Sequence, residues 1–270
     1  MSFIEKLNNI WSENDSLLCV GLDPDMSRLP VSLRDTPDAI FEFNKAIIDS
    51  THDLVCAYKP QIAYFSAESA EDQLEKTIHY IKTKYPNIPI ILDSKRGDIG
   101  STAEKYASEA FERYQADAVT INPYLGFDSV EPFINYKDKG TILLCRTSNT
   151  GAKDLQDLSV DGMPLYQKVA SLVSEQWNYN NNCLLVVGAT WPSQMSQVRS
   201  LVGDMPFLVP GVGAQGGDIE SLVKAGKTKN GTGLIISSSR AVIYASTGDD
   251  FAIKAREVAS QLRNEINSYR

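Results

Sequence analysis

Histidine is scarce in this sequence, and its cysteines are not paired. Only two histidines, His52 and His79, occur in 270 residues, both in segments with helical periodicity. None of the four cysteines belongs to a Cys-x-x-Cys pair, and each lies in or beside an apolar run, so we expect buried free thiols. This composition argues against a zinc site and against a Ser-His-Asp triad.

The sequence also lacks a block of basic residues and a long apolar run. Its formal net charge is −8, which argues against nucleic-acid binding and means that an anionic ligand needs a local site. The opening residues MSFIEKLNNIW have neither the basic nor the apolar region of a signal peptide, and no run is long enough to span a bilayer. We therefore expect a cytoplasmic protein without a membrane partner.

Short runs rich in Val, Ile, Leu and Cys are abundant, by contrast. There are eight, at residues 17–23, 54–60, 89–95, 118–124, 141–148, 184–190, 207–213 and 233–240. Each is too short for a helix and too continuously apolar for a half-exposed strand. This pattern is typical of strands in a parallel sheet that is covered on both faces.

Segments with helical periodicity separate the apolar runs. In residues 101–115 the apolar positions share one stripe, and Ser101 with Glu104 predicts a capping box at the start of that helix. Eight strand–helix units without a linker favour a (β/α)₈ TIM barrel, a single α/β domain over residues 1–270. The alternative is an open, doubly wound sheet.

Polar residues follow the predicted strands at the end where barrel enzymes carry their chemistry. They are Asp23, Lys59, Asp93, Lys95, Asp98, Asn122, Ser148, Thr190, Gln215 and Arg240. Strand alternation predicts that Asp93 and Lys95 point to the same face. A lysine between carboxylates stays protonated, so Lys95 suits proton donation better than Schiff-base formation.

Two loops have a distinctive composition. The segment PGVGAQGGD at 210–218 precedes a predicted helix, so its backbone amides, including those of Gly211 and Gly213, can surround an anion. Arg240 follows the eighth strand nearby and can bind a phosphate in a bidentate manner. The long polar loop at 151–164 predicts either a lid over the site or a disordered segment.

The motif Asp93-Ser94-Lys95-Arg96-Gly97-Asp98 resembles the Asp-x-Lys-x-x-Asp motif of the orotidine 5′-monophosphate decarboxylase family, in its longer-chain subfamily. The resemblance extends through VGLDPD, AYKPQIAYF, NPYLG, RTSNTGA, PGVGAQGGD and SSSR, in that order along the chain. It departs from shorter members at Ser-Asn-Thr-Gly in the fifth-strand loop and at Ser239.

The resemblance implies a homodimer with shared sites and assigns a role to each matching residue. Lys59, Asp93, Lys95 and Asp98 would form an alternating charged array, with Asp98 and Thr102 reaching the neighbouring subunit's site. Asp23 and Lys59 would hold ribose hydroxyls. Ser148 would bind the pyrimidine amide edge, and Gln215 and Arg240 would bind the phosphate.

The implied reaction converts orotidine 5′-monophosphate to UMP and CO₂ without a metal or organic cofactor. Lys95 would stabilise the charge at C6 electrostatically and then protonate it. Asp93 would position Lys95, and it could also repel the substrate carboxylate. Two alternatives remain open: a Mg²⁺-dependent sugar-phosphate decarboxylase or aldolase of the same barrel superfamily, and a non-catalytic phosphate-ligand sensor.

Overall fold

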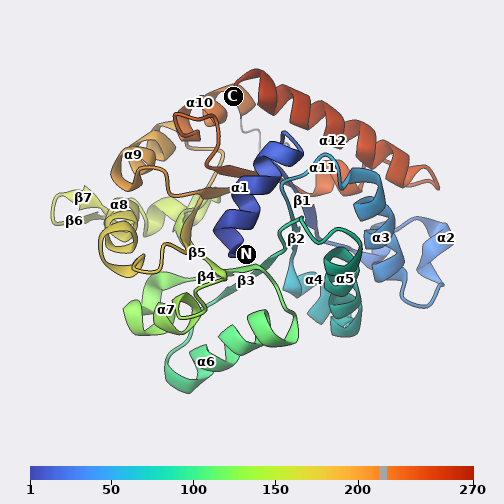
Figure 1. The fold of residues 1–270 in the computed structure, drawn as a ribbon, viewed down its shortest axis with the longest axis horizontal. Helices are drawn as coiled ribbons and strands as arrows, with labels where there is room; N and C mark the ends of the chain where they lie inside the picture. The colour runs from blue at the N-terminus through green and yellow to red at the C-terminus, as the bar shows by residue number, and fades with distance from the viewer. Residues whose placement is uncertain (213–217) are drawn as a thin grey trace.

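Eight parallel strands form the centre of the structure, a computed structural model that describes residues 1–212 and 218–270 (Figure 1). They are β1 (Leu18–Leu22), β2 (Ala57–Pro60), β3 (Ile91–Arg96), β4 (Ala118–Ile121), β5 (Gly140–Arg146), β8 (Cys183–Val187), β9 (Phe207–Pro210) and β10 (Leu234–Ser238). Each of the eight predicted runs overlaps one strand. The strands are buried along most of their length because helices cover their outer face.

The strand order shows that the sheet closes into a barrel. Hydrogen-bonded neighbours run from β2 through β1, β10, β9, β8, β5 and β4 to β3. The two end strands meet through parallel bridges, Tyr58 with Ile90 and Gln61 with Asp93. The predicted (β/α)₈ barrel is therefore confirmed, and the open doubly wound sheet is wrong.

Helices surround the barrel in Figure 1. They are α1 (Phe3–Glu13), α2 (Val31–Arg34), α3 (Ala39–Thr51), α4 (Ile62–Ser66), α5 (Glu71–Lys84), α6 (Gly100–Ser108), α7 (Phe127–Ile134), α8 (Leu165–Leu172), α9 (Pro192–Val202), α10 (Ile219–Gly226), α11 (Arg240–Ile243) and α12 (Phe251–Ser268). None of the described helices could cross a lipid bilayer.

The predicted helix at 101–115 is present, but its start and its regularity differ from the prediction. Helix α6 begins at Gly100 after Ile99, which provides no side-chain cap, so the capping box at Ser101 is wrong. The helix continues as a π-helical turn at Glu109–Arg113. Most of the predicted apolar stripe is buried, namely Ala103, Ala107, Ala110, Phe111 and Tyr114, whereas Tyr106 is partly buried.

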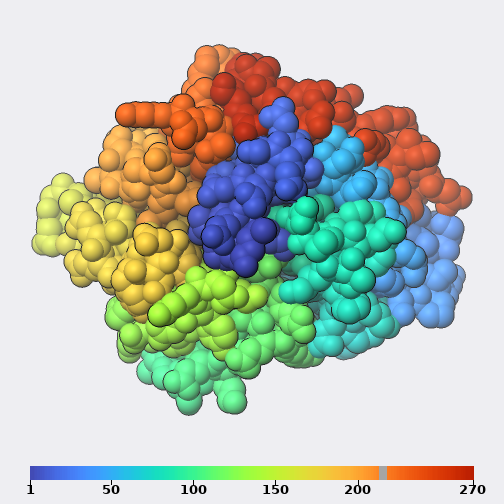
Figure 2. Space-filling view, in the orientation of Figure 1, coloured from blue at the N-terminus to red at the C-terminus, as the bar shows by residue number. Residues whose placement is uncertain are grey.

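Helix α1 covers the amino-terminal end of the barrel, a feature that the strand–helix alternation did not predict. Figures 1 and 2 show it across the centre of that face. Lys6 forms an ion pair with Asp117 just before β4, at 2.8 Å, and the Trp11 indole donates to the carbonyl of Leu234 in β10. The opposite, carboxyl-terminal end carries the polar side chains.

Candidate active site

The carboxyl ends of the strands surround a cleft with two adjoining cavities. The first, the Arg240 cavity, has a volume of about 200 Å³ and is lined by Asp23, Lys59, Asp93, Pro210, Gly211, Val212, Ser237, Ser239, Arg240 and Ala241. The second, the Ser148 cavity, has a volume of about 430 Å³ and is lined by Lys59, Asp93, Lys95, Thr120, Leu144, Thr147, Ser148, Asn149, Gln156, Val186, Leu208 and Pro210. Because Lys59 and Asp93 line both, the cavities share one charged cluster.

The buried Asp93 carboxylate is the centre of that cluster. Its Oδ2 accepts a hydrogen bond from Lys59 Nζ at 2.9 Å, and its Oδ1 accepts one from Lys95 Nζ at 2.6 Å. Lys59 Nζ also lies 4.0 Å from Asp23 Oδ1. Negative and positive groups thus alternate from Asp23 through Lys59 and Asp93 to Lys95. The resemblance implied an alternating array of Lys59, Asp93, Lys95 and Asp98, to which Asp23 did not belong.

The lysines determine the ionisation of Asp93. Burial raises the pKa of the Asp93 carboxyl, but Lys59 and Lys95 lower it more strongly, and the net pKa lies well below the usual value. Burial lowers the pKa of Lys59, whereas Asp93 and Asp23 raise it, with a net increase. Asp93 is therefore a carboxylate and Lys59 an ammonium group at neutral pH.

Lys95 reaches Asp93 from an irregular strand end rather than through regular alternation. The pairing of β3 with β4 shifts between Leu92 and Arg96, and Lys95 adopts a left-handed backbone conformation with φ 49°. The predicted proximity of Asp93 and Lys95 is confirmed, but its predicted geometric reason is wrong. The β-bulge between Leu92 and Arg96 directs the Lys95 side chain toward Asp93.

Sequence reasoning missed Thr120, a buried residue of β4 that contacts this irregular segment. Its hydroxyl accepts hydrogen bonds from the backbone amides of Ser94 and Lys95, each at 3.0 Å, and donates to Asp93 Oδ1 at 2.8 Å. Sequence reasoning did not select Thr120 because it lies within an apolar run. Its position two residues before Asn122 on a strand facing Asp93 is the signal that could have identified it.

Asp98 and Thr102 form no ion pair or side-chain hydrogen bond with the cluster among the residues that the structure describes. The Asp98 carboxylate accepts a hydrogen bond from the Ile99 amide at 2.8 Å, and Thr102 is exposed on α6. Arg96 pairs with Glu109 at 2.8 Å, across the start of the π-helical turn. That pair connects the end of β3 to the helix that carries Thr102.

Ser148 lies in the loop after β5, half-buried in the wall of the cleft. Gly188 permits this position, because a Cβ atom there would lie only 2.7 Å from the Ser148 backbone nitrogen. Gln156 holds the same loop: its side-chain oxygen accepts from the Thr147 amide at 2.9 Å, and its amide group donates to the Thr147 hydroxyl at 2.9 Å.

The long polar loop predicted at 151–164 has regular structure, so the disordered alternative is wrong. It contains a 3₁₀ turn at Thr150–Asp154 and the hairpin β6 (Ser159–Val160) and β7 (Met163–Pro164). Asp161 and Gly162 at the hairpin turn have φ values of 53° and 82°, typical of a tight two-residue turn. The loop borders the cleft through Gln156.

Arg146 is a second residue that sequence reasoning missed. Its side chain is almost completely buried at the end of β5, with its guanidinium 4.7 Å from the Trp191 ring centroid. It donates to Gln156 Oε1 and to Asp157 Oδ2, both at 3.3 Å. This buried cation therefore attaches the long loop to the barrel.

The described part of the Arg240 cavity contains Arg240 and Gly211, two of the residues predicted for a phosphate site. Arg240 is exposed at the first position of α11, and Gly211 has φ 102°, a conformation that favours glycine. Gly21 in β1 makes room for Ser239, whose hydroxyl oxygen would lie only 1.8 Å from a Cβ at Gly21. The predicted residues Gly213 and Gln215 lie outside the described residues.

The remaining sequence expectations concern thiols and metal ligands. All four cysteines are free and buried, and burial raises the pKa of Cys145 to about 12. His52 follows the end of α3 and His79 lies in α5, away from the cleft. Within residues 1–212 and 218–270, no group of three or more His, Cys, Asp or Glu side chains could hold a metal ion.

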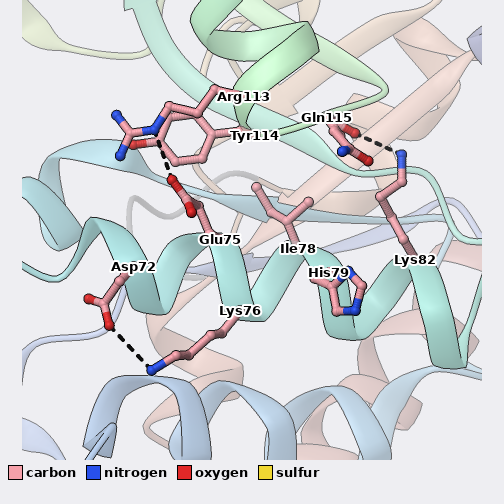
Figure 3. A pocket seen from close by; sticks show the side chains of 9 residues that line it. All are labelled: Asp72, Glu75, Lys76, Ile78, His79, Lys82, Arg113, Tyr114 and Gln115. Atoms are coloured by element: carbon pink, nitrogen blue, oxygen red, sulfur yellow. Dashed lines mark hydrogen bonds and ion pairs between the residues drawn. The ribbon is translucent and has the colours of Figure 1, made fainter.

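Another pocket, of about 400 Å³, lies on the outer surface between α5 and the residues that follow the π-helical turn (Figure 3). Its cations already have partners: Arg113 pairs with Glu75 at 2.8 Å, and Lys82 donates to the Gln115 carbonyl at 3.0 Å. This pocket lacks the buried charges of the cleft, so the cleft is the candidate active site.

Comparison with known proteins gives consistent results. The model of the orotidine 5′-phosphate decarboxylase / HUMPS family matches residues 16–254. An orotidine 5′-phosphate decarboxylase from Cellvibrio japonicus (strain Ueda107) is 72% identical over 269 residues, 99% of this chain and 98% of the relative.

Two solved structures from Leishmania donovani are also similar. The OMP decarboxylase is 39% identical with a TM-score of 0.87, covering 100% of this chain and 98% of that chain. The UMP synthase is 40% identical with a TM-score of 0.90, and the match covers 100% of this chain and 56% of that chain.

The depressed pKa of Asp93 predicts a pH-dependent contribution to stability. An unfolded aspartate titrates near pH ~3.9, so the contribution is complete above that value and is lost as pH falls through it toward the lower folded pKa. We expect the unfolding free energy of wild type relative to Asp93→Asn to stay constant from about pH 7 to pH 5 and to decrease as pH falls from about 5 to 3. Urea unfolding across that range measures it. A difference that stays constant would contradict the ion-paired state.

Proposed function

This chain belongs to the orotidine 5′-phosphate decarboxylase family, and from that premise we propose that its cleft converts orotidine 5′-monophosphate to UMP and CO₂ in pyrimidine biosynthesis. Family membership and full-length similarity to named decarboxylases support this carboxy-lyase activity. The observation that carries the residue assignments is the contact of the buried Asp93 with both Lys59 and Lys95.

The two cavities match the two ends of the substrate. Arg240 and the backbone at Gly211 would bind the phosphate, with Gly213 and Gln215 completing the group. Asp23 and Lys59, where the cavities meet, would hold ribose hydroxyls. Ser148 would face the pyrimidine in the Ser148 cavity, which Lys95 also lines.

The chemistry requires a cation at C6 of the pyrimidine. When the bond between C6 and the carboxylate breaks, CO₂ leaves and the electron pair stays in an in-plane orbital that the ring π system cannot delocalise. An ammonium group held in place before the reaction stabilises this pair without reorganisation. Lys95 supplies that charge and then transfers a proton from Nζ to C6, which completes UMP.

Asp93 positions this ammonium group. Its Oδ1 holds Lys95 Nζ at 2.6 Å, while Lys59 holds its Oδ2 at 2.9 Å. A carboxylate at this place would also repel the substrate carboxylate, which is lost in the reaction. Phosphate binding far from C6 supplies free energy for organising the cleft around the reacting group.

We further propose a homodimer in which Asp98 and Thr102 complete the partner subunit's site. Both residues follow β3 in the sequence, and among the described residues neither forms an ion pair or side-chain hydrogen bond with the array of its own chain. Exposed apolar side chains follow the ends of β3 and β4: Ile99, next to Asp98, is 54% exposed, and Tyr124 is 73% exposed. Tyr124 also lines a largely apolar cavity of about 420 Å³ with residues of β5 and α8. A second copy would bury it.

The alternative functions fit the cleft less well. The Mg²⁺-dependent decarboxylases and aldolases of the superfamily need a metal-binding glutamate near the end of the second strand, where this chain has Lys59. A cation there opposes a divalent ion and suits an anionic substrate. A non-catalytic sensor would not need the complete array. We therefore propose a reaction without metal or cofactor, in a single cytoplasmic domain over residues 1–270.

Replacing Lys95 tests the centre of the mechanism. Wild type should consume orotidine 5′-monophosphate in the presence of EDTA, measured by the loss of its absorbance. Lys95→Ala should abolish CO₂ release with an intact fold, because both the charge at C6 and the proton are lost. The exposed Lys84→Ala serves as the matched control. Loss of wild-type activity in EDTA would favour the Mg²⁺-dependent alternative, and near-normal turnover by Lys95→Ala would exclude the proposed role of Lys95.

Replacing Arg240 tests the phosphate site. Arg240→Ala should weaken substrate binding by about 2–4 kcal/mol, the loss typical of a charged bidentate contact, and KM should rise accordingly. Arg263→Ala is the control, since Arg263 contacts only Asn264 among the hydrogen bonds of the described residues. An unchanged KM in Arg240→Ala would contradict the phosphate assignment.

Mixing two inactive variants tests the shared sites. Lys95→Ala and Asp98→Ala chains, each inactive alone, should regain activity when they form hybrid dimers, because one site then contains neither substitution. Differently tagged chains allow the hybrids to be isolated before assay. Hybrids that remain inactive would show that each site is built within a single chain.

A further inference from the structure

The hydrogen bonds of Thr120 are unusual because one hydroxyl serves two consecutive backbone amides. In a regular parallel ladder successive amides point to opposite sides of a strand. Here the shift in β3 turns both the Ser94 and the Lys95 amide toward β4, where Thr120 Oγ1 accepts each at 3.0 Å. The Thr120 hydroxyl thus takes the place of the backbone carbonyls that would accept hydrogen bonds from these two amides in a regular ladder.

These contacts determine the direction of the hydroxyl proton. A threonine hydroxyl has one donor and two acceptor positions, and the two amides occupy both acceptors. The remaining proton points to Asp93 Oδ1 at 2.8 Å, the oxygen that also accepts Lys95 Nζ. Asp93 Oδ2 is left to Lys59, so the two carboxylate oxygens have different and fixed partners.

The same contacts hold a strained backbone. Lys95 has φ 49°, a conformation that is unfavourable for a non-glycine residue and persists only where its surroundings enforce it. Two amide hydrogen bonds to a fully buried side chain supply that constraint. Thr120 therefore fixes both the backbone from which the Lys95 side chain begins and the carboxylate at which it ends.

We propose that Thr120 is a positioning residue for the decarboxylation: its hydroxyl locks the bulge that aims the Lys95 ammonium group and selects the Asp93 oxygen that holds it. The inference rests on the proposed function and extends it to a residue on β4. Thr120 acts through Lys95 and Asp93, while the phosphate and ribose contacts lie elsewhere in the cleft.

Two substitutions separate the hydroxyl from the methyl group. Thr120→Val keeps the shape and removes the hydroxyl; we expect kcat to fall about 100-fold, the effect of misplacing a reacting group by roughly 1 Å, with a much smaller change in KM. Thr120→Ser keeps the hydroxyl and loses the methyl group, so it should retain kcat close to wild type while its thermal stability falls.

A purely structural role gives a different pattern. It predicts that both variants lose stability while their folded molecules keep kcat; either that result, or an equal loss of kcat in both, would overturn the proposal. If Thr120→Val does not fold, Thr120→Cys replaces it, because a thiol is a weak donor and acceptor. It should lose kcat in the same way, and wild-type kcat in Thr120→Cys would then overturn the proposal.

A structural measurement keeps this inference distinct from the proposed function. In crystal structures without substrate, Lys95 should leave the left-handed region in Thr120→Val and stay in it in Thr120→Ser, whatever reaction the wild type catalyses. Unchanged Lys95 geometry in the valine variant would overturn the positioning role. A wild type inactive on orotidine 5′-monophosphate would contradict only the proposed function.

Discussion

The ionised Asp93 carboxylate is the group on which the rest of the cleft depends. A buried carboxylate is costly unless it is paired and hydrogen-bonded, and here two ammonium groups and a hydroxyl satisfy its oxygens. In return the carboxylate raises the pKa of Lys59 and holds the Lys59 and Lys95 side chains close together. Neither lysine would hold its position beside the other without this negative group between them.

The barrel makes this cluster possible because one of its ends is packed with apolar side chains and the other end carries the polar ones. Its amino-terminal end is covered by α1 and consists of packed apolar strands, whereas the carboxyl ends of different strands each contribute one or two polar side chains. Residues distant in sequence, such as Asp23 and Lys95, thereby face the same cleft. Their separation is set by strand spacing, so rigid elements supply the preorganisation that electrostatic catalysis needs.

Much of this arrangement could be predicted from the sequence, for identifiable reasons. Continuous apolar runs between helical segments predicted all eight strands, and the polar residues after the first, second, third, fifth and eighth runs line the two cavities, whereas Asn122 and Thr190 do not. The capping box at Ser101 failed because the chain enters α6 one residue earlier, at Gly100, whose φ of 54° suits glycine. Thr120 and Arg146 were missed because a single polar residue in an apolar run gives no signal of its partners. Those partners, the turned amides beside Lys95 and the loop residue Gln156, exist only in three dimensions.

Two glycines described above constrain the shape of this cleft. Gly188 and Gly21 end up against Ser148 and Ser239, at distances where any side chain would displace a wall of the cleft, although neither glycine belongs to the residues that line it. The lining residues can be replaced one at a time, whereas a side chain at either glycine would require the adjoining serine to move. Variation in the shape of the cleft is thus limited by two positions with no side chain at all.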